Sequence, residues 1–337
     1  MIAVDYHADL KEVQSDAHLS AMLSPAGQDA PFDRLDWWQG LVTHCDIVPL
    51  LAVARDGDDV VVLPLTGGGG ELEALSNWYT FRFRPIISGT GDGRTLMTAL
   101  ARDISHRAHR ITLSGIPDED GSASLLEESF RGAGWHVMRE MSDTNHVLHM
   151  TGRSWQEYHA SLPGKLRTTL KRKSSKVDCR VLTHFDEQVW SEYEAIYNLS
   201  WKPEEGSPAF LRAFAQAEGR AGRLRIAIAH ADGKAVAAQM WTVEGGTAFI
   251  HKLAHREDAK PLSPGSVLSA ALFRHVIDVD KVGLIDFGTG DDAYKRDWME
   301  DIRPRYKLKM MRPLAPQNWL DFAKTGLRRL AGRSKHV

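Results

Sequence analysis

Residues 225–241 read Arg-Ile-Ala-Ile-Ala-His-Ala-Asp-Gly-Lys-Ala-Val-Ala-Ala-Gln-Met-Trp, which is two apolar runs around Asp232-Gly233. An Asp-Gly pair between such runs is a strong signal for a β-hairpin with a tight turn. The first half of the chain repeats the pattern, because residues 51–55 and 60–65 are apolar runs on either side of Asp56-Gly57-Asp58. The sequence therefore predicts two hairpins of the same kind.

The segments that follow the two hairpins also correspond. Each hairpin precedes another apolar segment, then an amphipathic stretch of helical length, then a short strand that ends in a Gly-containing loop. The predicted helices are 94–108 and 265–279, and the closing strands are 111–115 and 283–288. This order predicts a duplicated α+β domain, with domains at 1–150 and 151–312 and a tail at 313–337.

Length and composition agree with a two-domain globular protein. The chain has 337 residues, 43% hydrophobic and 26% charged, with a formal net charge of -2. That charge argues against a protein whose whole surface binds polyanions, although local basic patches are compatible with it. Two cysteines cannot build a disulfide framework, and the histidines show no metal-ligand spacing, so we expect no metal. With no stretch of ~18 apolar residues and no signal peptide, the expected location is the cytoplasm.

A basic segment lies between the two predicted domains. Residues 155–177 have a helical pattern, and from 165 to 177 they contain no acidic side chain but six basic ones: Lys165, Arg167, Lys171, Arg172, Lys173 and Lys176. Such a helix is usually a solvated face. Its functional interpretation is attraction of an anionic acceptor, with Arg167 as a candidate contact, or of tRNA.

The stretch Lys260-Pro-Leu-Ser-Pro-Gly-Ser-Val-Leu268 is the strongest ligand signal. Pro, Gly and Ser come together where a strand leads into a helix, and a helix N-terminus offers unpaired N–H groups and a partial positive charge to a phosphate. The candidate contacts are Leu262, Ser263, Gly265, Ser266 and Val267. The alternative interpretation is that Ser-Pro-Gly only caps the helix.

A second cluster follows the apolar strand 282–285, in the stretch from Asp286 to Trp298. It places Asp286, Asp291, Tyr294 and Lys295 within a short Gly-spaced loop, which is more titratable chemistry than a connection needs. The alternative is a capped turn in which Asp286 or Asp291 accepts backbone hydrogen bonds while Tyr294 and Trp298 pack in the core.

Weaker candidates are single residues and aromatic pairs. His251 lies in a predicted strand, where a histidine is either a general base or, more often, structural. The pairs Trp201-Lys202 and Trp78-Tyr79 are candidates for a substrate pocket, although aromatic side chains more often belong to the core.

Taken together, residues 155–309 resemble the acetyltransferase family related to the cellulose-biosynthesis protein CelD. This family is a branch of the GNAT superfamily allied to the FemABX peptidoglycan aminoacyltransferases. The resemblance runs from Trp155-Gln-Glu-Tyr158 and the basic segment 166–172, through the Asp-Gly hairpin and Ser263-Pro-Gly265, to the loop from Asp286 to Trp298. The first half is similar more loosely, through residues 32–38, its hairpin and Gly134-Trp135.

The resemblance implies tandem GNAT-like α+β domains in a FemABX-like double-GNAT architecture, with the first domain degenerate. It implies an acyltransferase that uses acyl-CoA, with acetyl-CoA the expected donor, bound by the second domain at 262–267, and an acceptor between the domains. The single glycine in that loop departs from the usual Arg/Gln-x-x-Gly-x-Gly/Ala pattern. The expected acceptor is an amine, less readily a hydroxyl, of a sugar or cell-envelope precursor.

The implied reaction is direct attack on a thioester, and it assigns the catalytic roles. Asp291 or His251 is the expected base, Tyr294 the proton donor to the thiolate, and Lys295 the partner of the developing oxyanion. Asp286, Trp298, Trp201, Lys202, Trp78, Tyr79 and Arg167 are the expected substrate contacts.

Two other functions stay open at this stage. One is aminoacyl transfer from aminoacyl-tRNA, for which the basic helix would be the docking surface. The other is a ligand-binding scaffold of polysaccharide assembly without catalytic activity. In addition, the stretch 318–335 combines a Trp, Phe and Leu stripe with basic side chains, which predicts packing on the second domain or peripheral contact with the inner face of the membrane.

Overall fold

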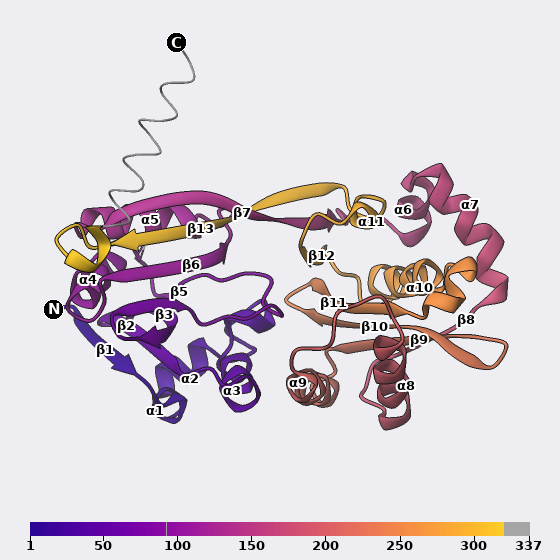
Figure 1. Cartoon of the computed structure of the whole chain (residues 1–337), viewed down its shortest axis with the longest axis horizontal. Helices are drawn as coiled ribbons and strands as arrows, with labels where there is room; N and C mark the ends of the chain where they lie inside the picture. The colour runs from indigo at the N-terminus through magenta and orange to yellow at the C-terminus, as the bar shows by residue number, and fades with distance from the viewer. Residues whose placement is uncertain (92, 320–337) are drawn as a thin grey trace, which may run out of the picture. The chain divides into compact units, whose positions relative to one another are not determined.

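The computed structural model describes residues 1–91 and 93–319. The chain forms two compact units (Figure 1), each assembled from separate stretches of sequence. Unit 1 contains Met1–Met22, Ile47–Asp143 and the chain from Pro304, and unit 2 contains Leu23–Asp46 and Thr144–Arg303. Residues 320–337, most of the predicted tail 313–337, lie outside the described residues.

Unit 1 is a sheet with helices. Its strands follow the order β1 (Ala3–His7), β2 (Pro49–Asp56), β3 (Asp59–Gly68), β4 (Glu71–Ala74), β6 (Arg110–Ile116) and β13 (Asp301–Met311), and β5 (Ile86–Ser88) also pairs with β3. Only the β4–β6 pair is parallel among these neighbours. The helices are α1 (Leu10–Ser15), α2 (Ala17–Met22), α4 (Arg94–Asp103) and α5 (Ser122–Gly132), with 3-10 turns η2 (Ile104–His106) and η5 (Pro316–Asn318).

The core of unit 1 lies between this sheet and α4 and α5. Leu96, Met97 and Leu100 of α4 recur at helical spacing and are buried with Leu63 of β3 and Leu126 of α5. The apolar face of α4 therefore explains both why this stretch is a helix and where it packs.

Unit 2 has the strand order β7 (His136–His149), β12 (Leu284–Thr289), β11 (Thr247–His255), β10 (Lys234–Glu244), β9 (Leu224–Ala231) and β8 (Asp178–Leu182). Here only β11 and β12 pair in parallel. The helices are α3 (Leu35–His44), α6 (Trp155–Ser161), α7 (Gly164–Lys173), α8 (Glu187–Asn198), α9 (Pro208–Arg220), α10 (Pro264–Asp278) and α11 (Ala293–Arg296). Three 3-10 turns complete the unit: η1 (Pro31–Asp33), η3 (Ser174–Lys176) and η4 (Glu257–Leu262).

The core of unit 2 gathers around α10. Leu268, Leu272 and Phe273 of this helix are buried with Trp241 of β10 and Trp298, whose ring stacks on Phe273. The predicted helix 155–177 is in fact two helices, because Pro163 stands between α6 and α7 and its ring is incompatible with a helix interior.

The two units repeat one topology, as the sequence predicts. The hairpins β2–β3 and β9–β10 turn at Asp56–Asp59 and at Asp232-Gly233, and each occupies the same place in its sheet. In both units a third strand then leads through a helix, α4 or α10, to a strand parallel to it. Asp232 and Gly233 both have positive φ, the backbone that a tight hairpin turn requires.

The division into units differs from the predicted boundary near residue 150. Strand β13 pairs with β6 in unit 1, whereas the last residues of β7 pair with β12 in unit 2. Each sheet is therefore completed by a strand from the other half of the sequence. Residues 23–46 also belong to unit 2, so a single cut in the sequence does not separate the units.

Candidate active site

The start of α10 is held in place by a buried glutamine. Gln239 of β10 is fully buried and its side-chain amide donates to the carbonyl of Gly265 at 3.0 Å and to Ser269 Oγ at 2.8 Å. Its own oxygen accepts from the Trp241 indole at 3.0 Å. This network fixes the first turn of the helix against the sheet.

Not all of the predicted backbone donors are available in this loop. The Ser263 amide donates to the Lys260 carbonyl, and the Val267 amide donates to the Ser263 carbonyl. The amides of Gly265 and Ser266 lie in the first turn, where no carbonyl of the helix can reach them. Leu262 closes η4, and its side chain is half-buried against the core. Gly265 and Ser266 are therefore the two candidate phosphate donors.

Gly265 is also a point of close approach. A Cβ at this position would lie 3.2 Å from Cδ2 of His255, the last residue of β11. The His255 ring in turn lies 4.4 Å, centroid to centroid, from the ring of Trp201, which is half exposed. Any larger residue at position 265 would push against this ring pair.

The predicted contact Lys202 lies beside the same ring pair. Its ammonium is 5.3 Å from the centroid of Trp201, and burial lowers its pKa, partly opposed by the nearby carboxylates of Asp292 and Glu205. The structure thus brings together Trp201 and Lys202 at the end of α8, His255 at the end of β11 and the start of α10. A cation, two aromatic rings and helix N–H groups suit a ligand with phosphate groups.

Strands β11 and β12 separate next to this cluster. Their pairs run only from Thr247–Leu284 to Phe249–Asp286, although β11 continues to His255. The β10–β11 register shifts at Met240/Trp241, which makes His251 the extra, bulged residue of β11. Past Phe249, the edge of β11 that faces β12 therefore pairs with no strand among the described residues. Its backbone N–H and C=O groups can hydrogen-bond to a ligand.

His251 itself points into an aromatic cluster. Its Nε2 is 2.8 Å from Thr242 Oγ1, and its ring lies 5.2 Å from the ring of Phe214 and 6.0 Å from that of Phe32. Burial lowers the pKa of His251 to about 3, so the imidazole is neutral at physiological pH. This environment is that of a core histidine, the alternative that the sequence left open.

Four residues of the 286–298 loop are held inside the protein. Asp286 is buried and accepts from Asn145 Nδ2 at 2.6 Å and from the Gly288 amide at 2.7 Å. Lys295 is buried and its ammonium donates to the Thr289 carbonyl. Trp298 packs in the core, and the half-buried Tyr294 ring lies edge-on to Phe287 at 5.6 Å. Burial raises the pKa of Tyr294, so its phenol keeps its proton.

Asp291 is one of three exposed acids of this loop, with Asp292 and Asp297. Its carboxylate is paired with Arg296 and lies 3.2 Å from Nε2 of His146, which is buried in β7. The hydrogen bond from Arg296 is the largest effect on Asp291 and holds its pKa below the usual range. Sequence reasoning missed His146 and Asn145, because both come from a strand that the sequence predicts in the other domain.

The remaining predicted contacts lie elsewhere. Arg167 is exposed on α7, away from the Trp201–His255 ring pair, and lines a separate groove. Trp78 and Tyr79 belong to unit 1, where Trp78 is exposed and Tyr79 is buried, with ring centroids 5.4 Å apart. Among the residues that the structure describes, no group of three or more His, Cys, Asp or Glu side chains could hold a metal ion.

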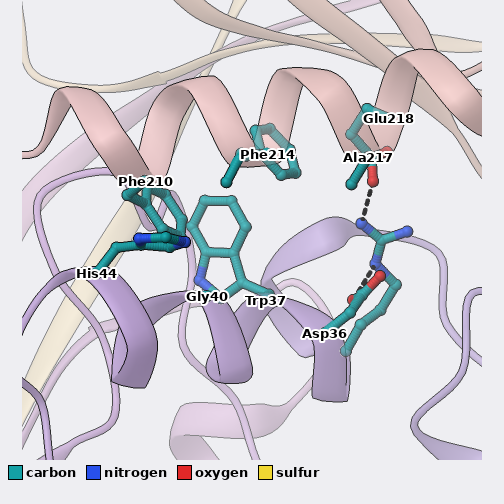
Figure 2. A pocket seen from close by; sticks show the side chains of 10 residues that line it. Asp36, Trp37, Gly40, His44, Phe210, Phe214, Ala217 and Glu218 are labelled. Carbon is teal, nitrogen blue, oxygen red and sulfur yellow. Dashed lines mark hydrogen bonds and ion pairs between the residues drawn. The ribbon is translucent and has the colours of Figure 1, made fainter.

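Helix α3 packs on α9 within unit 2 (Figure 2), although the sequence placed residues 32–38 in the first domain. Trp37 lies between Phe210 and Phe214, with 5.0 Å between ring centroids in each pair. Beside it, Arg34 is buried and donates to Glu218 at 2.9 Å and to Glu244 at 3.0 Å. A small pocket of about 170 Å³ remains between the two helices.

Gly40 permits this close packing, because a Cβ there would lie 2.9 Å from the ring of Phe210. Sequence reasoning missed this arrangement. Asp33 and Asp36 stand beside Arg34 in the chain, and nothing in the sequence points to the distant Glu218 and Glu244.

Comparisons with known proteins concern one segment of the sequence and the fold of the chain. Residues 164–296 match a family model described as an acetyltransferase (GNAT) domain. No curated protein matches the chain. Three solved structures that cover nearly all of it have low sequence identity, so their likeness concerns the fold.

One is the C-terminal DUF2156 domain of a putative lysylphosphatidylglycerol synthetase from Agrobacterium fabrum, with 13% identity, 90% of this chain and 93% of that chain covered, and a TM-score of 0.59. FemX has 8% identity, coverage of 90% and 96%, and a TM-score of 0.58. A tandem GNAT protein from the clavulanic acid biosynthesis pathway has 12% identity, coverage of 91% and 98%, and a TM-score of 0.50.

These comparisons identify the fold of the chain. Residues 164–296 match the model of a GNAT acetyltransferase domain, and the chain has a mixed α+β fold of the double-GNAT kind. Within the described residues no helix is long and apolar enough to cross a bilayer.

Proposed function

We propose that unit 2 transfers an acyl group, in the simplest case acetyl, from acyl-CoA to an amine of a sugar or cell-envelope precursor. The observation that carries the proposal is the convergence of Gly265 and Ser266 amides, Lys202 and the Trp201–His255 ring pair where β11 and β12 separate. The helix N–H groups and Lys202 would take the pyrophosphate, and the separated strands would take the thioester arm.

The reaction requires a new C–N bond and a broken C–S bond. The acceptor nitrogen attacks the thioester carbonyl, the carbonyl oxygen gains negative charge, and free peptide N–H groups on the β12-facing edge of β11 would oppose that charge. The sulfur leaves as a thiolate and needs a proton, which the acceptor nitrogen loses when the amide forms. Tyr294 would donate a hydrogen bond to the thiolate, because burial keeps its phenol protonated.

The acceptor side is assigned to Asp291. Its lowered pKa favours binding an ammonium group over removing a proton, and the contact at 3.2 Å with Nε2 of His146 would give the proton a route away from the acceptor. Lys295 would position the loop through Thr289 rather than contact the oxyanion, since its ammonium is buried against that carbonyl. His251, neutral and buried, has no role in proton transfer in this scheme.

Release of free thiol from acetyl-CoA in the presence of an amine panel tests the proposal. The panel pairs glucosamine with glucose, and each amine with its alcohol analogue. We expect turnover with amino sugars and stabilisation of the protein against heat by acetyl-CoA, because a ligand that binds only the folded state raises its melting temperature. No stabilisation by acetyl-CoA would refute the assignment of the donor.

Aminoacyl transfer from aminoacyl-tRNA is the second candidate. The exposed basic helix α7 favours it, and solved structures of similar fold include one named FemX and one named for a putative lysylphosphatidylglycerol synthetase. Retention of charged tRNA on a filter at physiological salt, with no stabilisation by acetyl-CoA, would select this function. Stabilisation by acetyl-CoA without any thiol release would instead indicate a binding scaffold.

A further inference from the structure

A groove of about 950 Å³ runs between α7 and α10 in unit 2. Its cations are Arg167 and Lys171 on α7 and Arg274 on α10, so both walls carry positive charge. Within the part of the chain that the structure describes, no acidic side chain lines it. A concave surface lined by charges of a single sign concentrates ligands of the opposite sign.

These three cations have no carboxylate partner among the described residues, a property they share with Arg172, Arg180 and Arg220, but they are the ones that line the groove. Seven other arginines of the unit form ion pairs: Arg34, Arg153, Arg212, Arg223, Arg225, Arg256 and Arg296. Like charges that face one another across a groove repel, and an anion between them removes that repulsion.

The rest of the groove suits a flat ring. Ala270 and Ala271 of α10 are small and leave space opposite α7. At the α6 end, the partly exposed ring of Trp155 lies 5.3 Å from the ring of His159, and both line the groove. Aromatic rings beside cations are the features with which proteins bind a nucleotide base and its phosphates.

The groove is separate from the proposed donor site. It lies along the stripe Val267, Ala270, Ala271 and Arg274 of α10 and includes Cys179 of β8. The donor cluster lies instead at the Trp201–His255 ring pair and the gap between β11 and β12. Only Val267 lines the groove and also belongs to the stretch 262–267 that the sequence predicts for the donor.

We propose that this groove binds a nucleotide with two or more phosphate groups, as a second ligand independent of the acyl donor. The two walls would bind the phosphates, through Arg167 and Lys171 on one side and Arg274 on the other. Trp155 would stack on the base.

Calorimetric titration of the full chain with ATP tests the phosphate contacts. In the variant Arg167→Glu/Arg274→Glu we expect at least a tenfold rise in the ATP dissociation constant. The matched control Arg220→Glu/Lys234→Glu makes the same charge change at two exposed positions of unit 2 outside the groove, and its constant should stay within twofold. Equal affinity in both variants would overturn the proposal.

The variant Gly265→Val separates the groove from the donor site. Acetyl-CoA binding should weaken while ATP binding stays within twofold of wild type. Loss of ATP binding in Gly265→Val, with no loss in the groove variant, would show that ATP only occupies the donor site and would overturn the second site. The groove assignment survives a failure of the acyl-CoA proposal if ATP binding still depends on Arg167 and Arg274.

Trp155→Leu tests the base contact. ATP affinity should fall several-fold, whereas inorganic pyrophosphate, which has no base, should bind as in wild type. Unchanged pyrophosphate binding also shows that the groove is still folded. If ATP fails to bind at millimolar concentration while single-stranded RNA or phosphatidylglycerol vesicles bind through Arg167 and Arg274, the ligand is a macromolecule or a membrane and the nucleotide proposal is wrong.

Discussion

Units 1 and 2 share a strand order but differ in the third strand of each sheet. In unit 2 this strand is β11, nine residues long, and it continues past the end of its pairing with β12. In unit 1 the corresponding β4 has four residues, and β3 pairs along its other end with β5 instead. Only unit 2 therefore has a long strand that separates from its parallel neighbour.

The starts of the matching helices differ as well. Gly265, in the first turn of α10, faces the His255 ring, beside which Trp201 and Lys202 lie. Gly93 before α4 faces Ile87 of β5, whose side chain would be 2.9 Å from a Cβ at that position. In unit 1 an aliphatic side chain occupies the place where unit 2 has an aromatic and cationic cluster. The duplication has kept the scaffold in both units and the candidate donor site in one.

The largest predicted difference between the units concerns stability. Arg34→Ala should lower the free energy of unfolding by about 3–5 kcal/mol, because it leaves Glu244 buried without its cation and leaves buried Glu218 with Arg223 alone. Arg139→Ala in unit 1 removes a partly exposed pair with Asp118 and should cost at most about 1 kcal/mol. Urea denaturation of both variants measures the contrast. Equal losses would mean that residues 23–46 do not hold unit 2 together.

The sequence predicted the repeated part of the fold well. Both hairpins and the helix α10 follow from short-range patterns, namely Asp-Gly between apolar runs and Ser-Pro-Gly before an amphipathic stretch. It did not predict that β13 completes unit 1 or that α3 belongs to unit 2. These pairings join segments far apart in the chain, and local periodicity carries no information about which distant partner a strand or helix chooses.

The candidate site shows the same limit. Gly265 and Lys202 were found from their own neighbourhoods, whereas His146 and Gln239 were not, because each acts through residues distant in sequence. The acids and the lysine of the 286–298 loop were recognised as chemistry-bearing. Whether each side chain faces solvent or the core depends on packing, and Asp286 and Lys295 face inward.

A second test addresses the acceptor side of unit 2. Asp291→Asn should lower turnover about 100-fold, the usual size of an acid–base contribution, because the neutral amide neither binds an ammonium nor pairs with His146. Asp297→Asn, an exposed acid six residues further on, is the matched control and should leave turnover unchanged. Steady-state kinetics with the best amine of the panel measures both. Similar turnover in the two variants would move the acceptor away from this loop.

A third test compares one glycine from each unit. Gly265→Val should weaken acetyl-CoA binding by about 1–3 kcal/mol, since its side chain would meet His255 and block approach to the first-turn amides. Gly68→Val in β3 of unit 1 has nothing within 4 Å of the added Cβ and should bind acetyl-CoA like wild type. Calorimetry gives both affinities. Weaker binding in Gly68→Val would place a donor site in unit 1.

The smallest expected effect, measured per pH unit, is a pH dependence that unit 2 owes to Glu244. Burial raises the pKa of this carboxyl from 4.5 to about 7, more than Arg34 lowers it. The folded state therefore binds more protons than the unfolded state between these values, so the contribution of Glu244 to stability is present below pH 4.5 and is lost as pH rises to about 7. The slope should approach but not exceed about 1.4 kcal/mol per pH unit.

Urea denaturation from pH 5 to 8 should show this decline in wild type and in the exposed control Glu204→Gln, and a flatter profile in Glu244→Gln. Glu218 has a lowered pKa, and its opposite effect falls in more acidic solution, outside this window. An unchanged slope in Glu244→Gln would show that another group titrates. It would also show that Glu244 stays charged beside Arg34 from pH 5 to 8.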